Sequence, residues 1–117
     1  MRRASLLLLI ALTACSGPYD QQLDVINYAY SQHLPYAEGA WCTHKQMNNR
    51  DFIGCPYKVG GSQKTAVWLL EGKTFLAVNG TARSDREALG NYTEFQDLPR
   101  PVPDDIDIPA MVAEFQR

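Results

Sequence analysis

Three cysteines and two histidines carry most of the reactive chemistry available to this chain of 117 residues. A catalytic pair could be built from Cys42 or Cys55 with His33 or His44 as its base, because a thiol nucleophile needs a base beside it. The same side chains could be considered for zinc, but Cys42 and His44 lack the usual ligand spacing and Cys55 has no neighbouring ligand. We therefore expect no catalytic residue, no metal site and no cofactor here.

Acidic residues give no better candidate for catalysis or metal binding. Asp104, Asp105 and Asp107 form a small cluster, but a calcium loop also needs a glycine at its turn and a distal glutamate in register. The glutamates are scattered along the chain and suggest no carboxylate pair for glycoside chemistry. Gly60-Gly61 lacks the spacing of a phosphate-binding loop and is interpreted as a turn. The chain is predicted not to be an enzyme.

The beginning of the chain has the three parts of a secretory signal. Arg2 and Arg3 form a basic start, residues 6–12 are apolar, and residues 13–14 are small or short. A helix that crosses a bilayer needs roughly 20 apolar residues, so this run is too short to serve as a membrane anchor. We predict that residues 1–14 are a signal peptide and are removed.

Leu12-Thr13-Ala14-Cys15 resembles the lipobox of bacterial lipoproteins, a resemblance confined to about the first 15 residues. It implies cleavage before Cys15, a diacylglycerol on its thiol and often a further acyl chain, such as palmitate, on the new amine. Two or three acyl chains hold a protein stably at a membrane, whereas one holds it only marginally. Ser16 after the anchor resembles the outer-membrane default, so we expect a lipid-anchored protein at the outer membrane, facing the periplasm.

Lipidation of Cys15 would leave Cys42 and Cys55 as an even pair in an oxidising compartment. We therefore expect a disulfide between them, which would stabilise the fold by about 3 kcal/mol. Loss of Arg2 and Arg3 with the signal would make the body more acidic than the full chain, whose net charge is −2. Because phosphate binding needs a basic patch, no nucleic-acid partner is expected.

Apolar periodicity predicts an amphipathic helix near the anchor and a hairpin in the middle of the chain. Leu23, Ile26, Tyr30 and Leu34 recur at helical spacing, and Pro35 ends the pattern, which predicts a helix over Gln21–Leu34. Two runs rich in β-branched and aromatic residues, Thr65–Leu70 and Thr74–Val78, flank Glu71-Gly72-Lys73 and predict a β-hairpin.

The remaining segments give weaker signals. Residues 36–61 are interpreted as loop-rich, with short extended pieces at 41–43, 52–53 and 57–59 and a turn at 48–51. Ser84 and Glu87 have capping-box spacing, so a helical turn is expected over Asp85–Leu89, ending at Gly90. Four prolines between residues 97 and 109 favour an extended arm before a short terminal helix over Pro109–Phe115.

These signals predict an α+β protein in which an N-terminal amphipathic helix packs on a small antiparallel sheet. One disulfide and a proline-rich C-terminal arm complete it. The expected organisation is a signal peptide (1–14), a lipidated anchor and short tether (15–19), an α+β domain (20–96) and the arm with its terminal helix (97–117).

The expected lipid anchor on a small domain favours a non-catalytic accessory or interaction subunit of an envelope assembly, for secretion, conjugation or wall maintenance. Its partners would be the membrane, through Cys15, and an envelope protein. Aromatic residues serve either in a hydrophobic core or in an exposed protein contact. The sequence does not decide between these two roles for Tyr28, Tyr36, Trp41, Tyr57 and Trp68. The alternative function is a periplasmic or surface inhibitor of an enzyme such as a wall-degrading lysozyme, inserting a loop between Cys42 and Cys55.

Overall fold

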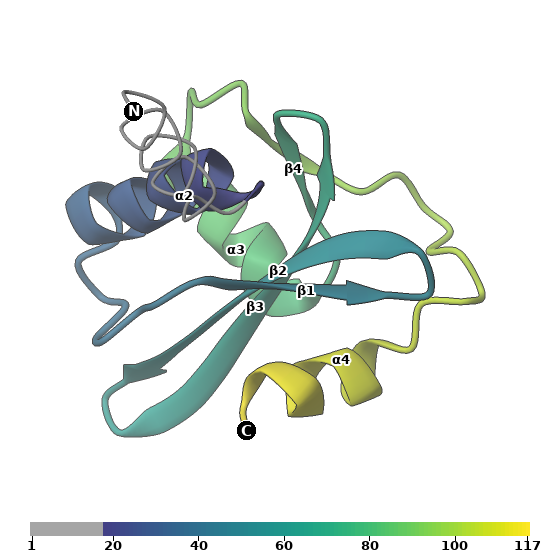
Figure 1. The fold of residues 1–117 in the computed structure, drawn as a ribbon. Coiled ribbons are helices and arrows are strands. Elements are labelled where there is room, and N and C mark those ends of the chain that lie inside the picture. The colour runs from purple at the N-terminus through teal and green to yellow at the C-terminus, as the bar shows by residue number, and fades with distance from the viewer. Residues whose placement is uncertain (1–17) are drawn as a thin grey trace, which may run out of the picture.

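The computed structural model describes residues 18–117, which form an α+β fold around one five-stranded sheet (Figure 1). The strand order is β1-β2-β3-β4-β5, and the α+β class predicted from the sequence is confirmed. The elements in chain order are α2 (Asp20–His33), β1 (Thr43–Met47), β2 (Arg50–Val59), β3 (Ser62–Glu71), β4 (Thr74–Ala77), α3 (Gly80–Leu89), β5 (Phe95–Asp97) and α4 (Ile108–Phe115).

Tight turns connect the first four strands into an antiparallel meander. Asn48 and Asn49 both have positive φ, as a two-residue hairpin turn requires. Gly60 and Gly61 fill the same role between β2 and β3. The hairpin predicted from the sequence is β3 and β4, whose Glu71–Thr74 pair leaves a turn one residue shorter than expected.

The expected antiparallel sheet is wrong for its last strand, because β5 pairs with β4 in parallel. Parallel neighbours need a crossover connection, and α3 supplies it. The helical turn expected over Asp85–Leu89 is therefore only the second half of a longer helix. Its N-cap is Asn79, whose side chain accepts from the Ala82 backbone N–H at 3.1 Å.

The loop-rich interpretation of residues 36–61 is also wrong, since ten of these residues form the continuous strand β2. Gly54 and Pro56 suggested breaks in the sequence, but tertiary packing explains why each is accepted within the strand. The ring of Phe115 lies against the Gly54 backbone where a side chain would stand. Pro56 lies beyond Gly54, the last β2 residue paired with β1, so its missing N–H removes no bond from that ladder.

Each face of the sheet carries its own core, and different helices cover the two faces (Figure 1). On one face, α2 and α3 pack over strand residues that include Ile53, Trp68 and Phe75. On the other, α4 and the segment after β5 pack over Phe52, Val67 and Leu69. The buried residues of that covering layer are Leu98, Ile106, Met111 and Phe115, so the proline-containing segment contributes directly to a core.

Candidate functional site

The predicted disulfide between Cys42 and Cys55 is confirmed. Their Cα atoms are 4.2 Å apart, and both residues are buried in the core beneath α2. The bond occupies both sulfurs, so neither is available as a thiolate. The chain between them is the β1–β2 hairpin and not a projecting loop. Its turn is held to the C-terminal segment, where Arg50 Nε donates to Asp105 at 2.8 Å and lowers the pKa of that carboxyl group.

The two histidines lie at opposite ends of α2. His33 is the last residue of the helix and meets the ring of Tyr92 edge-on, with centroids 5.2 Å apart. His44 stacks at 3.8 Å on Tyr19, the residue that precedes the helix. Within residues 18–117, no group of three or more histidine, cysteine or acidic side chains is arranged to hold a metal.

Asp51 links Tyr19 and His44 into a small cluster at the edge of the sheet. The Tyr19 hydroxyl donates to Asp51 Oδ1 at 3.0 Å, and His44 Nε2 lies 3.0 Å from the same oxygen. The hydrogen bond to Asp51 raises the pKa of Tyr19. The cluster therefore fixes the start of α2 against β1 and β2.

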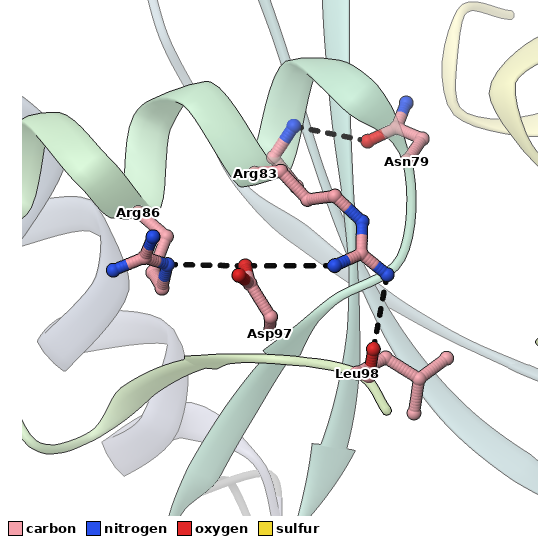
Figure 2. A network of polar contacts seen from close by, with 6 residues as sticks. Asn79, Arg83, Arg86, Asp97 and Leu98 are labelled. Carbon is pink, nitrogen blue, oxygen red and sulfur yellow. Dashed lines mark hydrogen bonds and ion pairs between the residues drawn. The ribbon is translucent and has the colours of Figure 1, made fainter. Parts of the chain in front are cut away.

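A second polar network joins α3 to the parallel edge strand (Figure 2). Figure 2 shows Arg83 and Arg86 reaching Asp97 from two sides, and Arg86 Nε donates to Asp97 Oδ1 at 3.0 Å. Arg83 also donates to the Leu98 backbone oxygen at 3.0 Å. Arg86 thus ties β5 to the crossover helix, and Arg83 ties both β5 and the residue after it to the same helix.

The most unusual polar group in the described structure is Asp85, a carboxylate that is only 1% exposed. Three tyrosine hydroxyls donate to it. Tyr30 does so to Oδ2 at 2.6 Å, Tyr36 to Oδ1 at 2.7 Å, and Tyr57 to both oxygens at 2.8 and 3.1 Å. The Tyr30 hydroxyl accepts in turn from Trp68 Nε1 at 3.2 Å. We call Asp85, Tyr30, Tyr36 and Tyr57 the tyrosine–aspartate cluster.

Burial and hydrogen bonding have opposite effects on this carboxyl group. Burial disfavours the charged form and raises the pKa of Asp85, while the three tyrosine hydrogen bonds lower it and offset part of that rise. For Tyr36 and Tyr57, burial and the bond to a negative acceptor both act upward and hold each pKa well above its ordinary range. The hydroxyls therefore remain protonated donors at neutral pH.

An open groove runs beside the cluster. Its lining comes from the α2–β1 loop, the β2–β3 hairpin and the first turns of α3, and comprises Tyr36, Tyr57, Val59, Lys64, Gly80, Thr81, Ser84 and Asp85. Tyr36 is 39% exposed, whereas Tyr57 is buried behind it with ring centroids 6.2 Å apart. Buried Asp85 is therefore linked to the surface through Tyr36, which donates to it and is partly exposed in the groove.

Trp41 is the most exposed large apolar side chain in the described structure, at 66%. Its backbone is nevertheless held in place. The next residue, Cys42, is in the disulfide, and the Asn27 side chain accepts from the Cys42 N–H at 2.8 Å and donates to its carbonyl oxygen at 3.4 Å. Tyr28, beside Asn27 on α2, is also exposed. Trp68, in contrast, is core.

Comparison of the chain with protein-family models, with curated proteins and with solved structures gave no match. Cys15 and the rest of the lipobox lie outside the described residues. Within residues 18–117, no helix has the length and apolar character to cross a membrane.

Proposed function

We propose that the protein is a small bacterial lipoprotein, anchored through lipid on Cys15 at the outer membrane. It acts as a non-catalytic interaction subunit of an envelope assembly, facing the periplasm. The lipobox, with its basic and apolar regions at the right distances, supports the anchor. The interaction role needs a surface that is both exposed and ordered, and Trp41 supplies it.

The exposure of Trp41 beside a restrained backbone is the observation that supports a protein contact. Tryptophan is enriched among the residues that dominate binding energy at interfaces, since it contributes a large area with few rotatable bonds. The disulfide and Asn27 restrict the backbone beside Trp41 before any partner arrives. Such preorganisation reduces the entropy lost on binding. Trp41 is therefore the proposed anchor residue of the interface.

The cluster of Tyr19, His44 and Asp51 determines where that interface can act. Tyr19 follows Cys15 by only four residues, and its stacking on His44 holds it against the sheet. A lipid on Cys15 would therefore keep the domain close to the membrane surface. The partner is expected at the same surface.

The anchor is tested by the intact mass of the mature protein purified from membranes. We expect a chain that begins at Cys15 and carries the added mass of two or three acyl chains. The Cys15→Ser variant, which cannot accept lipid, should retain residues 1–14. A wild-type N-terminus elsewhere, or an unmodified Cys15, would refute the anchor.

The interface is tested by placing a photo-crosslinking amino acid at position 41 of the lipoprotein in its own cells. The control carries the same amino acid at Gln63, an exposed residue of β3 near the β2–β3 turn. We expect a discrete crosslink from position 41 to an envelope protein, identified by mass spectrometry, and none from position 63. Uncrosslinked monomer alone at both positions would count against the proposal.

A further inference from the structure

The negative charge of Asp85 has no cationic partner in the described structure. The ion pairs within residues 18–117 involve other acidic residues and not Asp85. Buried charges in proteins are usually paired with an opposite charge as well as hydrogen-bonded. Here hydroxyl groups supply the hydrogen bonds to the carboxylate, which has no direct ion pair within the described residues although it lies beside an open groove.

The hydrogen bond from Tyr36 extends the influence of that charge toward the surface. A hydroxyl that donates its hydrogen keeps lone pairs as acceptors, and hydrogen bonds in a chain polarise one another. Tyr36 donates to Asp85 at 2.7 Å, so its oxygen is a strengthened acceptor, and its side chain is partly exposed in the groove. The wall of the groove thus combines tyrosine side chains with a hydroxyl group, that of Tyr36, which is bonded to the buried carboxylate.

We propose that this groove binds an ammonium group, and specifically the lysine side chain of a protein partner. A cation is attracted both by the faces of aromatic rings and by the charge behind them. An ammonium group has three donors that can rotate, and the residues that line the groove include three with hydroxyl groups, Tyr36, Thr81 and Ser84. A guanidinium fits less well, because its preferred bidentate carboxylate is occupied by the tyrosine donors. Trp41 is not among the residues that line this groove, and the site does not depend on the lipid.

Lys64 distinguishes a cation-binding groove from a purely structural cluster, because its charge should affect the affinity for a cation. It is an exposed lysine that lines the same groove, so its charge opposes an incoming cation. Lys73 is also exposed but lies in the turn at the other end of β3. Removing the charge of Lys64 should therefore strengthen binding, whereas removing that of Lys73 should not.

The test uses the protein purified from the cell envelope in mild detergent and follows the tyrosine ring signals by NMR. The probe is Nα-acetyl-lysine methylamide, and its Nε-acetylated derivative, which lacks the charge, is the control. We expect the charged probe alone to shift the signals of Tyr36 and Tyr57. Lys64→Gln should bind it about two- to threefold more tightly, and Lys73→Gln as the wild type does.

Two further variants address the carboxylate and the ring. Asp85→Asn should weaken binding about tenfold, the effect of one unit of charge at short range. If that variant does not fold, Tyr36→Leu removes the partly exposed ring and hydroxyl and should also weaken binding, as followed by the Tyr57 signal. Equal shifts from the charged and acetylated probes, no shifts from either, or no gain in Lys64→Gln would each overturn the proposal. Trp41→Ala should bind the probe as the wild type does.

Discussion

Phe115 of α4 occupies the space that a side chain at Gly54 of β2 would need. The terminal helix can lie flat on the sheet because this strand position has no Cβ. The pair therefore explains both a glycine inside a ten-residue strand and the docking of the last helix.

Gly54→Ala should destabilise the protein by about 1–3 kcal/mol, because the new methyl group must displace the Phe115 ring from a packed core. Urea unfolding followed by circular dichroism measures this. Gly80→Ala is the matched control, since a methyl group there meets no atom within 4 Å. It should leave stability unchanged or raise it by up to about 1 kcal/mol. Equal effects of the two substitutions would contradict this role of Phe115.

Asn79→Ala should cost about 2–4 kcal/mol. The Asn79 side chain caps α3, accepts from the Val67 N–H at 3.0 Å and donates to the Thr65 carbonyl oxygen at 2.8 Å. Its loss leaves buried backbone groups of β3 without a partner. Ser84→Ala, at the cap position suggested by the sequence, should cost almost nothing, because Ser84 is exposed inside the helix. Thermal unfolding of both variants distinguishes the two caps, and a larger loss in Ser84→Ala would reverse the assignment.

Local signals in the sequence predicted the features that depend on local geometry. The turn at Asn48-Asn49 and the helix end at Gly90 need positive φ, and the residue types reveal that need. Strand β2 was missed for the opposite reason. Gly54 and Pro56 resemble breaks locally, and only their tertiary neighbours, Phe115 and the end of β1, make them acceptable in a strand.

The tyrosine–aspartate cluster could not be predicted from spacing. Tyr30 and Asp85 lie 55 residues apart, on different helices. The sequence marks Tyr36 and Tyr57 only as aromatics that suit either the core or a contact, and Asp85 only as the first residue of an expected helical turn. A buried carboxylate has no sequence signature, since burial is determined by packing from several elements at once.

Breaking the disulfide should lower stability by about 3 kcal/mol, because the bond restricts the unfolded chain over a separation of 13 residues. The Cys42→Ala, Cys55→Ala double variant and the reduced wild type should both show the loss in denaturant unfolding. Added reductant should not change the double variant further. A wild type whose midpoint is insensitive to reductant under unfolding conditions would contradict a stabilising bond.

Asp85 should give stability a pH dependence opposite in sign to that of most acidic residues. Its pKa in the folded state is raised above the ordinary 3.8, so the folded protein binds this proton more tightly than the unfolded chain does. Its contribution is therefore least unfavourable below about pH 3.8 and becomes a penalty as the pH rises through the folded-state pKa. Asp105, whose pKa is lowered by Arg50, contributes in the other direction. The pH dependence of the free energy of unfolding in the wild type therefore contains both contributions.

Comparison with Asp85→Asn isolates this effect, since asparagine keeps the shape and cannot ionise. The stability of Asp85→Asn relative to the wild type should rise as the pH increases from about 4 toward neutrality, as measured by urea unfolding at each pH. Asp105→Asn should instead lose stability relative to the wild type over the acidic range, because the wild-type ion pair with Arg50 forms as the pH rises. A constant difference between Asp85→Asn and the wild type across that range would mean that the folded-state pKa of Asp85 equals its unfolded value, which would require the tyrosine bonds to cancel the cost of burial completely.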